Sequence, residues 1–471
     1  MGNFFKLLKS AGIYFLGNVL TRLISFFLLP IYTAFIAKAD LGYFDVSTSY
    51  LNILIPVICL EIWSGIMRFM FDFKQSEDKY KVIFNGMIIF SFSILIYTII
   101  FVILGFVADI QSIILIFVYG IFLMLQYLYT YLARALGFNK IFAVSGIISS
   151  LVNSVSNIIM IIVMGMRLNS LYLAMIFGLF VQMIILESKV RIYTNISFKM
   201  LDLVMIKSMI RFSLPLCLNS ACFWFLSSYN RVGISNTLGL EANGLYTVAG
   251  KFTMIMSVVA NCFSLAWQEL VYSLGNRKEN KGHLYSIASN YYLTLLMFGT
   301  MLILPVVNVI FPYFIDSSYY ETYSIIPLYM FATALSTYSS FLGNIFGAEK
   351  KTNIIFYSTL IAAVINVVTF HTLVGVVGLQ AANIGLALGY SINIIMRILL
   401  LKRSFDIYLD YFKILFVLLL NVPVFYIYLT QTTMVNILSF VIIATIMIFI
   451  YRDMIKSIFT SIRDRKSNKT S

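Results

Sequence analysis

Residues 16–46, LGNVLTRLISFFLLPIYTAFIAKADLGYFDV, indicate what kind of fold the chain adopts. Apolar side chains fill most of this stretch, yet Arg22 and Asp45 stand within it. A run of about 20 apolar residues crosses the hydrocarbon core of a lipid bilayer as one α-helix. A charge on a lipid-facing helix costs several kcal/mol at that depth, so these two side chains predict a polar environment inside a membrane protein.

The whole chain has the composition of a membrane protein. Hydrophobic residues make up 61% of its 471 residues, charged residues make up 11%, and the mean hydropathy is +0.94. These values lie far outside the range of soluble domains. We therefore expect an all-α integral membrane protein with about 14 transmembrane helices. The expected spans are residues 10–37, 42–70, 82–107, 110–133, 141–165, 169–187, 212–238, 243–273, 287–314, 322–346, 354–374, 376–401, 412–430 and 433–451.

The charge pattern orients these helices. The net charge is +14, and 26 of the 33 lysines and arginines, with Lys413 at the very edge of a span, fall on the side that holds both termini. Lys38 and Arg167 are on the other side, and five basic residues lie within spans. This positive-inside distribution predicts cytoplasmic termini. Because the basic residues follow the membrane topology, no nucleic-acid partner is expected.

The two halves of the chain share a pattern. Gly42 in DLGYFD matches Gly244 in ANGLYT, and residues 153–170 resemble residues 362–380. The matches keep the same order, and six spans stand on each side of the middle of the chain, which favours a duplication. An even number of spans per repeat gives both copies the same orientation, so two lobes would face each other across a central cleft.

The duplication divides the chain into four parts. Residues 1–187 form an N-lobe of spans one to six, and residues 212–403 form a C-lobe of spans seven to twelve. Residues 188–211 mix basic and apolar side chains, which predicts an amphipathic linker on the cytoplasmic membrane surface. Residues 404–471 hold the last two spans and a basic cytoplasmic tail.

Depth separates the five basic residues within the spans. Arg22, Arg231 and Lys251 are about 10–18 Å from the nearer end of their spans at 1.5 Å per residue, so we expect them to line a polar cavity. Arg68 and Arg397 are within about 6 Å of a cytoplasmic end, where a long side chain extends to the headgroups. Arg68 is kept as a fourth cavity candidate.

Apart from Glu187 at the last residue of a span, three carboxylates lie within the spans and give these cations an alternative role in buried ion pairs. Asp45 is the expected partner of Lys251, and Glu61 that of Arg68, whereas Glu269 stands near a cytoplasmic boundary. Asp45 and Glu61 are also the candidates for coupling transport to protons or sodium, and Glu61 is the stronger of the two.

The excess of cations within the membrane favours an anionic cargo. A guanidinium binds two phosphate oxygens at once and stays charged, and a lysine adds a compact point charge. The cationic residues therefore predict a diphosphate site. Two histidines and four dispersed cysteines predict no metal site. The absence of GxxxxGK(S/T), GxSxG and HExxH motifs predicts a protein that is not an enzyme and needs no cofactor beyond a coupling ion.

Three stretches resemble a known superfamily: residues 16–46, EANGLYTVAGKF (241–252) and NVVTFHTLVGVVGLQAA (366–382). They are similar to the multidrug/oligosaccharidyl-lipid/polysaccharide (MOP) exporters, and within these to bacterial polysaccharide repeat-unit flippases of the Wzx type. The resemblance implies two six-helix lobes and alternating access in the bacterial cytoplasmic membrane. It also implies that spans one, two, seven and eight border the cavity, and that Arg22 occupies the place of the family's basic residue in the first span.

The implied cargo is an undecaprenyl-diphosphate-linked oligosaccharide for O-antigen, capsule or exopolysaccharide synthesis. The implied partners are membrane lipids, a polysaccharide polymerase and a chain-length regulator. Two other functions stay open. A cation-coupled drug exporter of the same superfamily would hold more acidic side chains in its interior, and an integral-membrane polysaccharide polymerase would carry a large external loop in place of the short ones expected.

Overall fold

The computed structural model describes residues 26–73, 76–192, 200–273, 281–349 and 351–470. Every regular element in these ranges is a helix, which agrees with the expected all-α class. Twelve of the described helices are long and apolar enough to cross a membrane. The chain is therefore a multi-pass membrane protein.

The helices follow one another in three sets. The first half contains α2 (Leu29–Phe35), α3 (Lys38–Ile58), α4 (Ile62–Met70), α5 (Ser76–Val107), α6 (Ile113–Ala135), α7 (Asn139–Ile158) with a π-helical turn (Ile159–Val163), and α8 (Leu168–Val190). The second half contains α10 (Leu203–Ser227), α11 (Tyr229–Leu238), α12 (Leu240–Ser273), α13 (Lys281–Phe314), α14 (Thr322–Ala348), α15 (Thr352–Val377) and α16 (Gln380–Phe405). The appended pair is α17 (Tyr411–Thr430) and α18 (Thr433–Thr470).

Two predicted spans are not single helices, and the prediction is wrong at these points. The span expected over 42–70 is divided into α3 and α4, and the span over 212–238 into α10 and α11. Leu60 and Glu61 both have φ of 51°, a left-handed conformation that ends α3. Ser228 separates α10 from α11. Apolar composition does not reveal either break.

Two further predicted segments lie partly outside the described residues. The first span, 10–37, is represented by α2 alone. In the linker expected over 188–211, residues 188–190 end α8 and residues 203–211 begin α10. The two ends of this segment thus extend the flanking helices, and residues 193–199 lie outside the described residues.

Asp202 fixes the beginning of α10. Its carboxylate accepts hydrogen bonds from the backbone N–H groups of Val204 and Met205, at 3.0 and 3.1 Å, and lies 2.9 Å from the ammonium of Lys81 on α5. Such a residue satisfies backbone donors at the start of a helix. Lys81 and these donors hold the pKa of Asp202 below its usual value. The start of the second half is thereby attached to the first.

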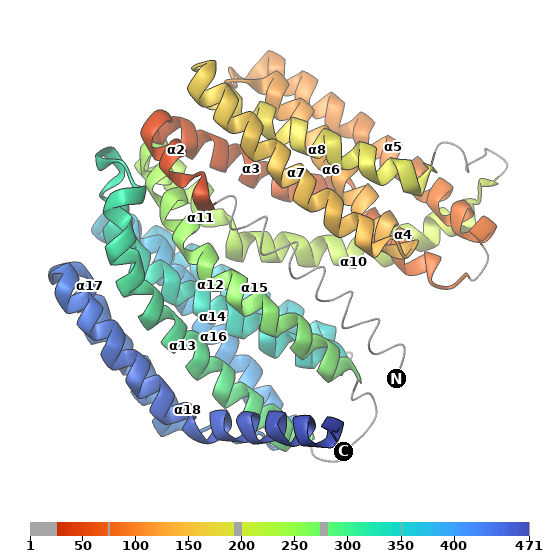
Figure 1. The fold of residues 1–471 in the computed structure, drawn as a ribbon. Coiled ribbons are helices and arrows are strands. Elements are labelled where there is room, and N and C mark those ends of the chain that lie inside the picture. Colours follow the sequence, from red (N-terminus) through yellow and green to blue (C-terminus); the bar gives the residue numbers. More distant parts are fainter. Residues whose placement is uncertain (1–25, 74–75, 193–199, 274–280, 350, 471) are drawn as a thin grey trace.

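Figure 1 shows the helices in two groups, with α3 to α8 in one and α12 to α16 in the other. Helix α10 contacts α3 and α4 of the first group and α15 of the second, so it bridges the two. Helices α17 and α18 pack on α13, along the outer side of the second group.

Helix packing repeats between the halves. Helices α6 and α7 both pack on α8, and correspondingly α14 and α15 both pack on α16. Small residues permit the close contacts: a Cβ on Gly178 of α8 would lie 2.7 Å from the Ser149 carbonyl oxygen, and one on Gly389 of α16 would lie 2.7 Å from that of Ala362. Gly, Ala and Ser at helix interfaces let backbones approach closely within membranes. The duplication predicted from sequence has this structural counterpart.

The halves meet where α3 crosses α12. A Cβ on Gly42 would overlap the carbonyl oxygen of Leu240 and lie 2.9 Å from the nitrogen of Gly244, and a Cβ on Gly244 would overlap the carbonyl oxygen of Lys38. Asn243 donates a 2.9 Å hydrogen bond to the Gly42 carbonyl. The two glycines that the repeat aligns therefore face each other near the beginnings of α3 and α12.

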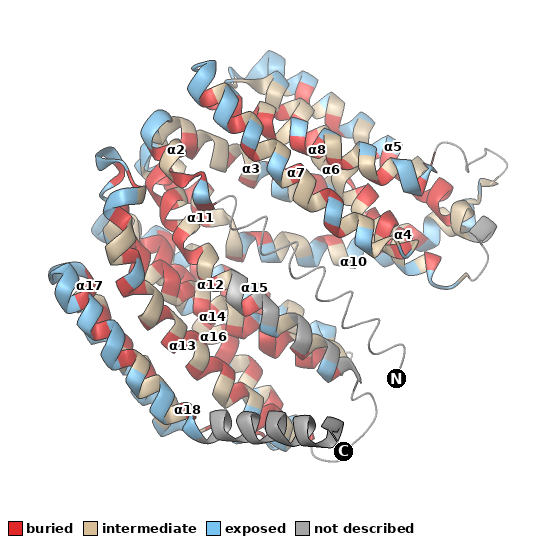
Figure 2. Ribbon diagram, in the orientation of Figure 1, coloured by how far each residue is buried: buried red, intermediate tan, exposed pale blue. Residues whose placement is uncertain are grey.

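The outer surface of the bundle is apolar. Figure 2 shows buried residues gathered between helices and exposed residues on their outer faces. Large apolar side chains stand among the exposed ones, including Phe106 at 88% and Phe412 at 90%. Soluble monomers rarely expose wide apolar patches, so these faces fit contact with lipid tails.

Gly42→Ala tests the crossing of α3 and α12. Alanine ordinarily stabilises a helix interior by about 0.5–1 kcal/mol relative to glycine, but overpacking of this contact costs about 1–3 kcal/mol. We expect a lower Tm of the purified protein. Gly375→Ala is the matched control, because a Cβ there meets no atom within 4 Å. Equal Tm values for the two variants would contradict the close crossing.

Candidate functional site

An ion pair joins the two halves beside this crossing. The Nε of Arg231 on α11 lies 2.8 Å from Oδ2 of Asp45 on α3, and the two side chains are 27% and 18% exposed. Asn243 on α12 stands 3.5 Å from the same carboxylate oxygen. Asp45 therefore pairs with Arg231, and the expected pairing of Asp45 with Lys251 is wrong.

The break before α11 positions Arg231. Asn230, next to it in the chain, donates a hydrogen bond of 2.9 Å to the Ala382 carbonyl on α16. It accepts one of 3.0 Å from the Asn366 amide on α15. The Asn366 amide also reaches the carbonyl of Phe225 in the last turn of α10, at 3.3 Å. These bonds satisfy backbone and amide groups that a helix break leaves open within a membrane.

Lys251 is the second cation of this region. It is half-buried on α12, within electrostatic reach of both Asp45 and Arg231. Among the described residues, no carboxylate lies within 4.0 Å of its ammonium. Because Asp45 already neutralises Arg231, Lys251 leaves the cluster with a net charge of +1. A buried cation of this kind favours an anion.

Glu61 occupies the break between α3 and α4. Its Oε1 accepts a short hydrogen bond from the Ser220 hydroxyl on α10, and its Oε2 accepts one of 3.2 Å from Ser64. Left-handed backbone at a residue other than glycine costs about 1–3 kcal/mol and is kept where the surroundings enforce it. The strained break turns the carboxylate from the first half towards a helix of the second.

A cavity of about 450 Å³ surrounds Glu61. Its aromatic wall includes Trp63 and Tyr127, whose rings stack with centroids 4.8 Å apart. Asn52 of α3 and Asn219 of α10 add amide groups from the two halves. The arrangement presents one carboxylate, amides and aromatic faces between α3, α4, α6 and α10.

Arg68 lies at the exposed end of α4. Its Nη1 is 2.5 Å from Oδ1 of Asp72, one helical turn away, and both side chains are 53% exposed. The expected pair with Glu61 is therefore wrong, since Glu61 binds hydroxyl groups in its place. An exposed pair of this type contributes little to stability.

Arg397 differs most from its expected position. The prediction that its side chain extends to the headgroups is wrong, because it is 3% exposed inside the second half. Its guanidinium donates to Ser339 on α14 and to Ser358 and Thr359 on α15. The side chain points across the helix bundle and not along the span to its end.

Two predicted residues cannot be placed. Arg22 lies outside the described residues, and the side chain of Glu269 does too. Within the described part of the chain, no group of three or more His, Cys, Asp and Glu side chains is arranged to hold a metal ion.

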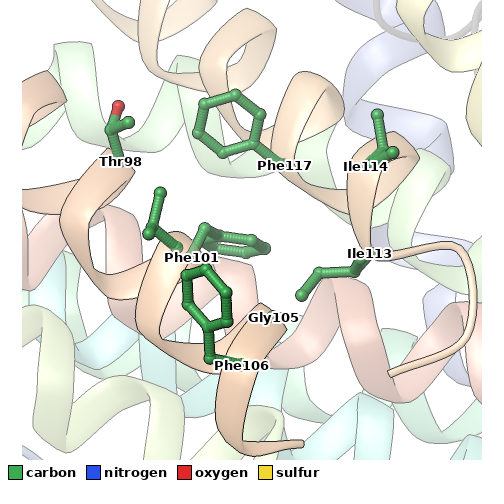
Figure 3. A pocket seen from close by; sticks show the side chains of 8 residues that line it. Thr98, Phe101, Gly105, Phe106, Ile113, Ile114 and Phe117 are labelled. Carbon is green, nitrogen blue, oxygen red and sulfur yellow. The ribbon is translucent and has the colours of Figure 1, made fainter. Parts of the chain in front are cut away.

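An apolar pocket of about 420 Å³ lies apart from these charges, between α5 and α6. Figure 3 shows its lining, in which Phe101, Phe106 and Phe117 stand with Ile113 and Ile114. The Thr98 hydroxyl is its one side-chain polar group. The pocket suits a hydrocarbon chain and offers nothing to a charged headgroup.

Residues 7–267, more than half of the chain, match the family model described as polysaccharide biosynthesis protein. The chain belongs to this family. No curated protein matches it in sequence.

Two solved structures share the architecture of this family member. The lipid II flippase MurJ in an inward closed conformation superposes with a TM-score of 0.70 at 16% identity, over 94% of this chain and 99% of MurJ. An inward-facing MATE multidrug resistance transporter of the MOP superfamily superposes with a TM-score of 0.62 at 16% identity, over 86% of this chain and 98% of that transporter. These likenesses show a MurJ- and MATE-like transporter fold. Together with the family match, they confirm the resemblance predicted from sequence.

One polar feature of this polysaccharide biosynthesis protein was missed from sequence. A cavity of about 530 Å³ lies between α6, α7 and α8. In its wall, Gln126 donates a hydrogen bond of 2.9 Å to Gln182, and the guanidinium of Arg134 lies 4.3 Å from the ring centre of Tyr131. Gln126, Thr130 and Arg134 recur every four residues, a spacing that puts them on one face of a helix. A polar stripe of this kind within an apolar span would have indicated the cavity from sequence.

Asp45→Asn tests the ion pair between the halves. Removal of the charge leaves Arg231 uncompensated, so we expect the purified protein to lose about 2 kcal/mol of stability, seen as a lower Tm. The double variant Asp45→Asn/Arg231→Gln should recover part of this loss, because it removes both charges. Strictly additive effects of the two single changes would show that the groups do not interact.

Proposed function

We propose that the protein is a flippase that moves undecaprenyl-diphosphate-linked oligosaccharides from the inner to the outer leaflet of the bacterial cytoplasmic membrane. The family membership and the transporter fold support this class of cargo. Both termini would lie in the cytoplasm, as the positive-inside distribution of its loops favours.

The observation that carries the proposal is the net positive cluster where α3, α11 and α12 meet. Arg231 and Asp45 neutralise each other there, and Lys251 remains as a cation without a carboxylate partner among the described residues. A diphosphate supplies the missing negative charge. Arg22 would join this cluster from the first span, and Arg68 would meet the cargo at the exposed end of α4.

Alternating access suits the duplicated architecture. The halves pack together where α3 meets α12 and through α10, and the duplicated lobes would rock about this contact. The headgroup would pass between the halves while the polyprenyl chain stays in lipid. The apolar outer faces of the helices would fit such a chain, as they fit contact with lipid tails.

Glu61 is the proposed site of coupling to a proton or sodium gradient. Asp45 is engaged by Arg231, whereas the partners of Glu61 among the described residues are hydroxyl groups, one from each half. Neutralisation of its carboxylate would weaken the hydrogen bond to Ser220 and so change the contact between α4 and α10. Coupling through Glu61 would therefore link ion binding to the motion of the halves.

The pathway partners would be a polysaccharide polymerase and a chain-length regulator, for O-antigen, capsule or exopolysaccharide. A MATE-like drug exporter is the second candidate, because the fold is shared with such transporters. The net positive cluster disfavours it, since a cationic drug would be repelled by Lys251.

Lys251→Ala tests the proposal in the native strain. We expect surface polysaccharide to fall at least about tenfold, because one charge-assisted contact to the diphosphate is lost. Lys251→Arg should retain most of it. Lys402→Ala, at the exposed end of α16, is the matched control. Membrane levels of each variant are measured by immunoblot. Normal polysaccharide from Lys251→Ala would contradict the proposal, and so would sensitivity to cationic dyes as the only defect of a deletion strain.

Glu61→Gln tests the coupling. Glutamine keeps the size of the side chain but cannot exchange a proton or offer a carboxylate to sodium. In proteoliposomes, we expect flipping by the wild type to respond to an imposed proton or sodium gradient and flipping by Glu61→Gln to be independent of both. A variant that keeps the full gradient response would place the coupling elsewhere.

A further inference from the structure

Arg397 is a buried charge without a counter-charge. Its Nε donates 3.0 Å to the Ser358 hydroxyl, and its Nη2 donates 3.2 Å to the Thr359 hydroxyl. Its Nη1 donates to the carbonyl and, at 3.1 Å, to the hydroxyl of Ser339. These partners are all neutral. None of the ion pairs among the described residues includes Arg397.

Hydrogen bonds to hydroxyls orient the guanidinium but do not cancel its charge. A cation removed from water keeps a desolvation cost of several kcal/mol unless an anion offsets it. The four bonds also use four of the five guanidinium N–H groups. One N–H of Nη2 is left for a further acceptor.

A cavity of about 220 Å³ adjoins this group. Its walls come from α10, α14, α15 and α16, and Arg397 is the one charged residue among those that line it. Gly343 makes room for the guanidinium, since a Cβ there would lie 3.1 Å from Nη1. Asn219, Asn344 and Tyr390 add neutral groups that can donate hydrogen bonds. The cavity is smaller than the roughly 300–1,000 Å³ of drug-sized ligand sites, so it fits a headgroup and not a whole oligosaccharide.

The cavity adjoins the Glu61 cavity along α10. Asn219 and Phe223, one helical turn apart, line both. The two cavities therefore meet along one face of this helix, with a carboxylate of the first half on one side of the meeting point and a guanidinium of the second half on the other. An anion would be attracted to the Arg397 side and repelled from the Glu61 side.

We propose that the Arg397 cavity is a binding site for a phosphate-type anion, separate from the Lys251 cluster. The cavity supplies one fixed positive charge, a guanidinium N–H and amide donors, which is the chemistry that binds phosphate oxygens. The phosphate belongs either to the diphosphate of a lipid-linked cargo or to an anionic lipid headgroup. Assignment to the cargo rests on the proposed function, whereas the anion site itself does not.

Binding is measured on the purified full-length protein in detergent. Pyrophosphate, compared with potassium chloride at equal ionic strength, should raise the Tm of the wild type by mass action. Arg397→Met should raise the Kd for pyrophosphate at least about tenfold. Asn344→Leu keeps Arg397 and its hydroxyl partners but replaces an amide of the cavity, so it should weaken binding as well.

Arg403→Met is the control, because Arg403 is exposed on the same helix. It should bind pyrophosphate as the wild type does. The proposal is overturned if pyrophosphate does not stabilise the wild type more than chloride, or if Arg397→Met and Asn344→Leu bind it with unchanged Kd. In that event Arg397 only ties α14, α15 and α16 together.

Two further ligands distinguish the source of the phosphate. A water-soluble prenyl diphosphate should bind the wild type more tightly than pyrophosphate if the site receives cargo, and Arg397→Met should lose this binding. Stabilisation by phosphatidylglycerol over phosphatidylcholine nanodiscs, without binding of prenyl diphosphate, assigns the site to a lipid headgroup. Either result supports the anion site, and only the first supports its role in transport. Loss of polysaccharide in Lys251→Ala is a separate readout, so the proposed function can fail while the anion site stands.

Discussion

The cost of placing charge inside an apolar helix bundle constrains the rest of the structure. An isolated ion there must be paired, hydrated or hydrogen-bonded. Three of these charges meet this demand, each in its own way. Arg231 has Asp45, Glu61 has hydroxyls from both halves, and Arg397 has hydroxyls and a carbonyl of its own half. Lys251 has none of these among the described residues, which is why it carries the proposed function.

The same demand explains where the helices break. Backbone groups freed within a membrane need partners as much as charges do. The break at Glu61 uses a strained left-handed turn, and the carboxylate it displays binds Ser220 of α10. The break at Ser228 is closed by the amides of Asn230 and Asn366. Both breaks face the contact between the halves, so the irregular backbone and the polar side chains lie in the same region.

Sequence alone predicted the class, most spans and the repeat, because these depend on residue composition and period. The match of Gly42 with Gly244 indicated the repeat, whereas their close contact where the halves meet is seen only in the structure. The ion-pair partners of the charged residues within the spans were predicted less well. Asp45 was expected beside Lys251 and Glu61 beside Arg68, because depth along a span says nothing of how neighbouring helices are rotated. The burial of Arg397 was missed for the same reason: a side chain near the end of a span reaches either the headgroups or a neighbouring helix, and only the packing of α14 to α16 decides between them.

We propose that this bundle moves an anionic headgroup between its halves. The most direct measurement is flipping in proteoliposomes of a fluorescent polyprenyl-diphosphate-linked sugar, beside the same sugar on an uncharged polyprenyl carrier and beside a cationic dye. We expect transfer of the diphosphate-linked sugar alone. Transfer of the cationic dye without transfer of the diphosphate-linked sugar would contradict it.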